Sequence, residues 1–331
     1  DYGGWSVLNT GEIIKRWGFN PRPKNRITIP VVEPIKFPSQ DVPLDPYKLG
    51  ILLGDGSFCG CVTLTTADKE IVSEFDNAVY VGRYEYRIRG LSQIIEELGI
   101  KGHSAWEKFV PEKYLFNTIE NRIAILRGLM DTDGSIGTNG AIEYCTTSKR
   151  LLEDVKFLVQ SLGGKVKTTE RFTKYTYKGI KRTGRKSYRL KIKIPINPFK
   201  LKRKAERFFV TGNTYNRVLR KIVLGGIDSS VCITVDNDRG LYVLKDFIVT
   251  HNTTIEAIKH IYHAMTKPNL AQLNLPTEGW LRTEYPTLNF GKTYEVAKAV
   301  YNTMIDIING DCLIYDGKGG QAHTNKSLIT Q

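Results

Sequence analysis

Two Asp-Gly pairs each close an apolar segment that has the composition of a packed helix. The first segment is "LGILLGDG", Leu49–Gly56, and the second is "LRGLMDTDG", Leu126–Gly134. Both contain small residues that would let two such helices approach closely, which would bring Asp55 and Asp133 together at one end. Two adjacent carboxylates require a counter-charge. Mg²⁺ provides one, and it can activate water and stabilise the leaving oxygen in phosphodiester cleavage.

An internal repeat favours a shared site over two unrelated turns. Taken singly, an Asp-Gly pair after a helix is most often a turn or a helix cap. Here the stretches that begin at Leu49 and Leu126 share one order of features: an apolar helix, Asp-Gly-Ser, a strand, Thr-Thr and a second helix. Two copies of one unit predict a pseudo-twofold arrangement in which each copy contributes one aspartate.

A basic block comes after the second copy. Residues 165–207 contain 17 Lys and Arg against Glu170 and Glu206, a local net charge of +15, whereas the whole chain carries +14. Such a local excess indicates a polyanionic partner. Within the block, "YRLKIKIP" (188–195) alternates apolar and basic residues as a strand does, which argues against a disordered tail. A two-stranded ribbon fits a DNA groove. The candidate DNA-binding residues are Arg171, Lys174, Lys178, Lys181, Arg182, Arg185, Lys186, Arg189, Lys191 and Lys193.

A second kind of chemistry is indicated at His251 and Asn252. The chain changes there from the strand pattern "FIVT" to the helix pattern "TTIEAIKH" without turn residues. The Asn252 side-chain amide can attack its own carbonyl carbon to form a succinimide, which breaks the peptide bond. His251 can hydrogen-bond that carbonyl or protonate the leaving amine, and Thr253 supplies a hydroxyl nucleophile that accepts the acyl chain. The alternative for a bare His-Asn pair is an ordinary turn.

The paired Asp-Gly segments resemble the LAGLIDADG homing endonucleases. The resemblance covers roughly residues 44–210, and "LRGLMDTDG" matches the signature at Leu126, Gly128, Asp131, Asp133 and Gly134. It implies a monomeric αββαββα pseudo-dimer whose saddle of strands holds a long asymmetric double-stranded DNA site. It also implies Mg²⁺-dependent double-strand cleavage, with Asp55 and Asp133 as metal ligands and with Lys191 or Lys193 as an assisting basic residue.

The flanks of this region resemble an intein, a protein-splicing element of the Hint type, with the endonuclease inserted in it. Residues 5–37 look like the link between the N-terminal splicing half and the endonuclease, and residues 230–253 look like the C-terminal splicing motifs. The first splicing residue and the Thr-x-x-His motif of the family are absent from Asp1 onward. We therefore expect the missing N-terminal intein half and N-extein to be partners in splicing.

The segment after Asn252 resembles a P-loop ATPase whose nucleotide loop is interrupted. In the P-loop motif G-x-x-x-x-G-K-[ST], a helix opened by Ser or Thr comes directly after Gly-Lys, and "TTIEAIKH" opens with two threonines. Thr253 and Thr254 are therefore candidate nucleotide-binding residues after splicing, with ATP and Mg²⁺ as cofactors of the host alone. Residues 286–311 and 324–330 look similar to the ATPase domain of phage terminase large subunits. A helicase or a RecA-like ATPase is the competing host.

The predicted architecture is α+β in four parts. We expect a remnant of the N-terminal splicing half at 1–43, the endonuclease at 44–210, the Hint segment at 211–252 and an α/β P-loop C-extein fragment at 253–331. The sequence has no run of about 18 apolar residues, so no membrane span is expected. Five cysteines without a C-x-x-C pair fit a reducing cytoplasm, in a prokaryotic or phage-infected cell.

Two other interpretations remain open at this point. One is a free-standing LAGLIDADG DNA-binding protein or maturase that does not splice, and the other is a terminase with an irregular insertion. The first copy is also shorter between Phe58 and Gly90 and carries fewer basic residues, so weak or lost cleavage is an alternative to full nuclease activity.

Overall fold

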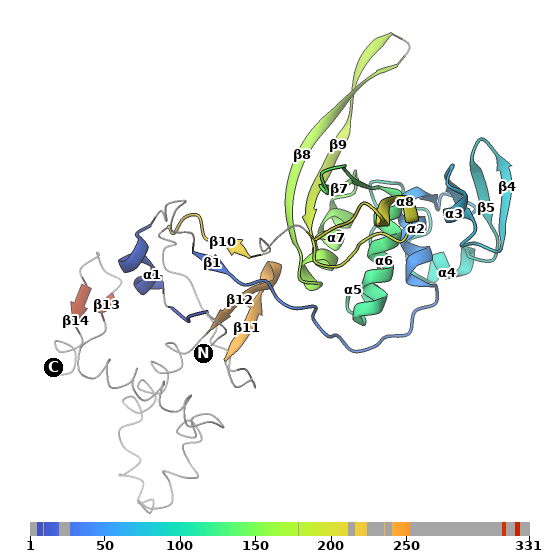
Figure 1. Cartoon of the computed structure of the whole chain (residues 1–331). Coiled ribbons are helices and arrows are strands. Elements are labelled where there is room, and N and C mark those ends of the chain that lie inside the picture. Colours follow the sequence, from blue (N-terminus) through green and yellow to red (C-terminus); the bar gives the residue numbers. More distant parts are fainter. Residues whose placement is uncertain are drawn as a thin grey trace, which may run out of the picture. The chain divides into compact units, whose positions relative to one another are not determined.

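The chain folds into two units, which we describe separately. The structure is a computed structural model that describes residues 5–8, 10–19, 27–177, 179–210, 216–223, 235, 240–251, 313–315 and 322–324 (Figure 1). Unit 1 comprises Asp1–Arg26, Arg220–Leu244 and Val249–Gln331, and unit 2 comprises Ile27–Leu219 and Lys245–Ile248. Most described residues belong to unit 2.

Unit 2 contains two copies of one supersecondary pattern. The first copy consists of α2 (Pro46–Asp55), β2 (Gly56–Ser57), β3 (Thr63–Thr65), α3 (Lys69–Val72), β4 (Ala78–Gly82), β5 (Glu85–Ile88) and α4 (Ser92–Glu97). After the short helix α5 (Glu112–Leu115), the second copy consists of α6 (Ile119–Thr132), β6 (Gly134–Ile136), β7 (Ile142–Thr146), α7 (Lys149–Ser161), β8 (Lys165–Tyr177), β9 (Ile180–Lys193) and α8 (Lys202–Ala205). Each copy is therefore αββαββα.

The two sheets have the same topology and different sizes. Their strand orders are β2-β3-β5-β4 and β6-β7-β9-β8, and all neighbours are antiparallel. In the first copy α3 has 4 residues and the hairpin strands β4 and β5 have 5 and 4, whereas in the second copy α7 has 13 and the hairpin strands β8 and β9 have 13 and 14. The long β8–β9 hairpin therefore has no counterpart of its length in the first copy (Figure 1).

Local signals fix where the long helices begin. The Asp45 carboxylate accepts a hydrogen bond from Lys48 N at 3.0 Å, and Pro46 occupies the first turn of α2. Thr118 caps α6 by accepting from Asn121 N at 3.3 Å, and Ser148 caps α7 by accepting from Leu151 N at 3.1 Å. These side chains satisfy backbone donors that have no partner within the helix.

The centre of unit 2 is the contact between α2 and α6. Both helices bury apolar side chains in one hydrophobic core that also takes in the inner faces of both sheets. At the crossing, a Cβ atom added to Gly50 would lie 2.9 Å from the Gly128 Cα, and one added to Gly128 would lie 2.8 Å from the Gly50 Cα. Only glycine permits backbones to approach this closely, so the two glycines bring the C-terminal ends of both helices together.

The chain enters and leaves unit 2 at neighbouring points. The short strands β1 (Thr28–Ile29) and β10 (Arg217–Val218) pair antiparallel, and Leu219 N donates to Ile27 O at 2.9 Å. Adjacent ends are the geometry that lets one domain be inserted into another protein.

The described elements of unit 1 are short and few. They are α1 (Thr10–Trp17), β11 (Leu241–Leu244), the end of β12 (Ile248–His251), β13 (Leu313–Tyr315) and β14 (Ala322–Thr324). The pattern "LYVLKDFIVT" predicts one strand, but the structure divides it into β11 and β12 around the 3₁₀ turn η1 (Lys245–Phe247). Asp246 and Phe247 adopt positive φ, which reverses the chain and ends strand geometry. Strand pattern is also predicted at residues 220–226, yet the described residues 220–223 are in no strand.

Candidate active site

Asp55 and Asp133 occupy equivalent places at the C-terminal ends of the two central helices. Asp55 is the last residue of α2, and Asp133 is the C-cap of α6, where its N–H donates to Leu129 O at 3.1 Å. The sequence predicts that the two carboxylates are brought together. The residues just before them do lie against each other, since a Cβ atom added to Gly54 would overlap the Thr132 side chain. In this arrangement the Asp55 charge contributes to a raised pKa of Asp133.

Two buried lysines contact the same helix ends. The Lys108 ammonium donates to Leu52 O, Leu53 O, Gly54 O and Gly56 O of the first copy at 2.6–3.3 Å. The Lys204 ammonium donates to Met130 O, Asp131 O and Gly134 O of the second copy at 2.6–2.9 Å. Lys108 is 4% exposed and Lys204 is 8% exposed.

The two lysines are related by the internal repeat. When Asp55 is superposed in sequence on Asp133, Leu52, Leu53 and Gly56 fall on Met130, Asp131 and Gly134, which are the three acceptors of Lys204. An ammonium group has three donors and favours the negative end of a helix dipole. Each lysine therefore completes the end of one central helix and places a positive charge beside the aspartates.

The four charged groups shift one another's protonation. Burial raises the pKa of Asp55, and it raises the pKa of Asp133 to about 6 with help from the Asp55 charge, while both lysines oppose these shifts. The Asp133 side chain is nevertheless solvent-exposed, and water moderates its shift. Burial lowers the pKa of Lys108 to about 8 and lowers the pKa of Lys204, whereas the acidic neighbours favour their charged forms.

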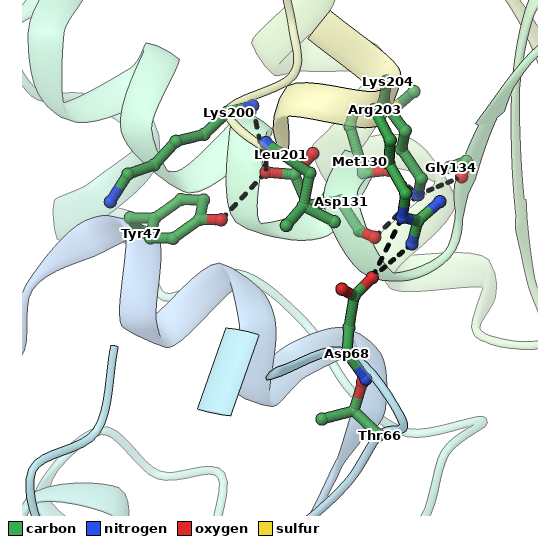
Figure 2. Close-up of polar contacts among 10 residues, drawn as sticks. All are labelled: Tyr47, Thr66, Asp68, Met130, Asp131, Gly134, Lys200, Leu201, Arg203 and Lys204. Carbon is green, nitrogen blue, oxygen red and sulfur yellow. Dashed lines mark hydrogen bonds and ion pairs between the residues drawn. The ribbon is translucent and has the colours of Figure 1, made fainter. Parts of the chain in front are cut away.

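A third aspartate holds Lys204 in place. The Asp131 carboxylate accepts from the Tyr47 hydroxyl at 2.9 Å and from Lys200 N and Leu201 N at 3.0 Å each (Figure 2). These bonds fix the backbone that begins α8, from which Lys204 extends to the end of α6. In the first copy Leu53 occupies the position of Asp131, so this anchor belongs to the second copy alone.

The donors present fit a magnesium ion only in part. The two aspartates offer hard oxygen ligands, but among the residues that the structure describes no three His, Cys, Asp or Glu side chains form a group that could hold a metal. Mg²⁺ commonly takes one or two carboxylates and completes its shell with water and phosphate oxygens. The pair therefore suits a cation that also binds the substrate's phosphate.

A basic face lies on the outer side of the second sheet. Strand alternation places Leu190 and Ile192 in the core and the side chains between them on the opposite face. That outer basic face is formed by Lys167, Arg171, Arg189, Lys191 and Lys193. Glu143 from β7 is also there, and it contacts Arg189 at 3.1 Å and Lys191 at 3.6 Å. Four of the ten predicted DNA-binding residues thus share one face, and Lys167 was missed.

The other predicted DNA-binding residues are distributed differently. Lys186 lies on the inner side of the hairpin, where its ammonium pairs with Glu170 at 2.6 Å. The Arg185 guanidinium stacks over the ring of Trp106, which lies between α4 and α5, at 3.6 Å. Three more, Lys174, Lys181 and Arg182, lie near the end of the hairpin, and Lys178 falls outside the described residues.

The predicted assisting residues and the lysines at the helix ends are different groups. Lys191 and Lys193 lie on the outer basic face, whereas Lys108 and Lys204 contact the ends that carry Asp55 and Asp133. Sequence reasoning missed the latter pair because their spacing from the two Asp-Gly motifs differs. The long β8–β9 hairpin adds residues before Lys204 that the first copy lacks before Lys108.

The predicted splicing and nucleotide-binding residues cannot be placed in the same way. The backbone of His251 ends β12, and Asn252, Thr253 and Thr254 fall outside the described residues.

No helix in the part of the chain that the structure describes is long and apolar enough to cross a membrane.

Comparison with known proteins gives two relatives and one family match. The chain is similar to replicative DNA helicase DnaB of Mycobacterium intracellulare, with 30% identity over 229 residues that cover 67% of this chain and 37% of that protein. It is also similar to DnaB of a Nostoc strain, with 39% identity over 75 residues that cover 21% of this chain and 8% of that protein. The chain thus spans well under half the length of these relatives. Residues 120–194, which include Asp133, the whole outer basic face and all of α6 except its first residue, match the family of LAGLIDADG-like domains.

Proposed function

We propose that unit 2 is a DNA endonuclease and that it is inserted in a protein-splicing element. The observation that carries the nuclease proposal is the pair of equivalent helix ends, each with one aspartate and one buried lysine, in the same body as the outer basic face. A LAGLIDADG-like domain at residues 120–194 supports the same assignment.

We assign separate roles in phosphodiester hydrolysis to the aspartates, the buried lysines and the outer basic face. Asp55 and Asp133 would hold Mg²⁺, which would supply polarisation of a phosphate and a bound water of lowered pKa. Lys108 and Lys204 offset negative charge that gathers around the scissile phosphate. The outer basic face would bind the DNA backbone on the side of the second copy.

Cleavage can be tested on DNA that lacks the insertion. A plasmid carrying an uninterrupted coding sequence for a DnaB-type helicase is incubated with the protein and Mg²⁺, and nicked and linear products are measured. We expect Asp133→Asn and Lys204→Met to reduce cleavage at least about a hundredfold, which is the scale of losing one electrostatic group at a reacting phosphate. Asp76→Asn and Lys202→Met are matched controls at exposed positions and should cut normally.

The same assay separates the nuclease from a DNA-binding protein or maturase. Binding of the plasmid without cleavage, at any Mg²⁺ concentration, would favour the latter. Undiminished cleavage by Asp133→Asn would remove that aspartate from the mechanism.

Splicing is the second part of the proposal. Its support is the sequence around Asn252 together with the adjacent chain ends of unit 2, which suit an inserted domain. Expression of the chain should release a 79-residue C-terminal fragment that begins at Thr253, visible by mass spectrometry. Asn252→Ala should abolish the break, whereas Asn269→Ala should not. A break that persists in Asn252→Ala would refute succinimide formation at this residue.

We propose a replicative helicase of the DnaB type as the host, in preference to a terminase. The observation that favours the helicase is the similarity to two DnaB proteins. Only 79 residues come after Asn252, so most of the matched length of the first relative lies before that residue. Sequencing the gene upstream of Asp1 tests the choice. Both hosts require Gly-Lys before the splicing nucleophile. Helicase sequence before that Gly-Lys would support a DnaB-type host, and terminase sequence there would refute it.

A further inference from the structure

Four residues just before the proposed splice junction pack on the LAGLIDADG-containing unit. Lys245–Ile248 belong to unit 2, although the chain on both sides of them belongs to unit 1. Asn252 lies five residues after Phe247, so the docked segment is the last one before the bond that the proposed function breaks.

Helix α7 supplies the charged part of the docking surface. The Lys156 ammonium contacts the Asp246 carboxylate at 2.7 Å, and its other carboxylate neighbour, Glu153, is farther away at 3.5 Å. The Lys156 side chain is 20% exposed and that of Asp246 is 36% exposed, so the pair is partly shielded from water. On the other side, the Arg217 guanidinium of β10 donates to the Asp246 carbonyl.

The apolar part of the surface is an aromatic cluster. The Phe247 ring meets Phe157 of α7 edge to face, with ring centroids 5.2 Å apart. Phe157 in turn contacts Phe116 at 5.0 Å and Phe37 at 6.2 Å. Phe247 therefore completes a four-ring cluster whose other members lie on unit 2 elements outside the docked segment.

The backbone of the segment depends on these contacts. Asp246 has φ 63° and Phe247 has φ 56°, values that L-residues other than Asn and Asp seldom adopt. A bulky residue stays in this conformation only when its surroundings hold it there. The contacts of Lys156, Arg217 and Phe157 supply that restraint, and the turn directs the chain from β11 into β12, which ends at His251.

We propose that α7 is the docking surface for Lys245–Ile248 and that this docking sets the path of the chain into the His251–Asn252 junction. The inference rests on the proposed splicing function, and it makes the endonuclease unit a positioning element for that reaction. A docked segment limits the conformations of the next few residues, which favours the attack of a side-chain amide on its own carbonyl.

The test uses charge reversal in the full 331-residue chain. Lys156→Glu places two carboxylates against each other, and Lys156→Glu with Asp246→Lys restores an ion pair of opposite polarity. Lys149→Glu makes the same charge change at an exposed position of α7 and is the matched control. Hydrogen exchange of peptides covering residues 241–251 reports docking, and the yield of the fragment beginning at Thr253 reports cleavage.

We expect Lys156→Glu to speed exchange of the docked segment on the order of tenfold and to slow the break by a similar factor, since an ion pair is replaced by repulsion. The double variant should recover both, and Lys149→Glu should change neither. Phe157→Ala should act like Lys156→Glu without altering any charge.

Each of the other outcomes refutes either the docking of Lys245–Ile248 on α7 or its positioning role. Unchanged exchange in both Lys156→Glu and Phe157→Ala refutes docking. Faster exchange with an unaltered break refutes the positioning role and leaves the splicing proposal intact. If the unmodified chain shows no break at all, C-terminal cleavage by this chain and the positioning role both fail, while exchange still decides the docking.

Discussion

Replacing Lys204 with methionine tests the central geometry of unit 2 without any DNA. The substitution keeps the buried stem of the side chain and deletes the ammonium group. Three hydrogen bonds of 2.6–2.9 Å to carbonyls at the end of α6 are lost. A buried carbonyl without a donor costs roughly 1 kcal/mol, and the lost charge at the helix end costs roughly 0.5–1 kcal/mol more. Methionine avoids the desolvation of an ammonium, so we expect a net loss of about 2–4 kcal/mol in the free energy of unfolding at pH 7.5.

The loss should depend on pH. Without Lys204, one of the two cations that oppose the raised pKa values of Asp55 and Asp133 is gone, so both pKa values rise further. A carboxyl whose pKa is higher in the folded state binds its proton more tightly there. Stability is therefore retained below the unfolded value, near 4, and is lost as pH rises through the folded value, which is about 6 for Asp133 before the substitution. The cost of Lys204→Met should accordingly be smaller at pH 5 than at pH 7.5.

Urea denaturation followed by circular dichroism measures this cost, and hydrogen exchange of α2 and α6 peptides assigns it to the helix ends. The control is Lys202→Met on the same helix, where the side chain is 81% exposed and lies 3.9 Å from Glu206. That control should stay within about 0.5 kcal/mol of the unmodified chain. A loss under about 1 kcal/mol for Lys204→Met, or one that grows toward pH 5, would refute the reasoning.

Three further substitutions probe the helix contact, the acid pair and the outer basic face. Gly128→Ala forces a Cβ to within 2.8 Å of the Gly50 Cα, so we expect a loss of at least about 2 kcal/mol in the same urea assay, and an unchanged midpoint would exclude close packing there. The free energy of unfolding of Asp133→Asn, relative to that of the unmodified chain, should rise as pH increases from 4.5 to 7.5, because the asparagine does not ionise. Solvent screening of this exposed group limits the rise to about 1 kcal/mol. A difference that shrinks with increasing pH would contradict the raised pKa of Asp133. Lys193→Gln should lower the salt dependence of DNA binding by about one counterion, measured by fluorescence anisotropy, whereas Lys186→Gln on the inner side of the hairpin should lower it less; equal effects would argue against a single binding face.

Several elements of unit 2 could be predicted because their signals are local. The apolar pattern predicts helices at 119–130 and 149–162, and the structure has them at Ile119–Thr132 and Lys149–Ser161, where Thr118 and Ser148 are the caps. Alternation of apolar and basic residues predicts a strand at 188–195, which is part of β9. The reversal at Asp246 and Phe247 was not predictable, because its positive φ values are held by contacts with residues distant in sequence.

The sequence by itself determined that two equivalent helices exist, that each ends in an aspartate and that a basic strand pair comes after the second. These features depend only on residue type and on short spacings along the chain, so they can be recognised without the folded structure. Only the tertiary structure decided which cations stand beside Asp55 and Asp133. Lys108 and Lys204 are far from the two motifs along the chain and reach them because the Gly50–Gly128 contact aligns the two helix ends, while Asp131 fixes the backbone from which Lys204 extends.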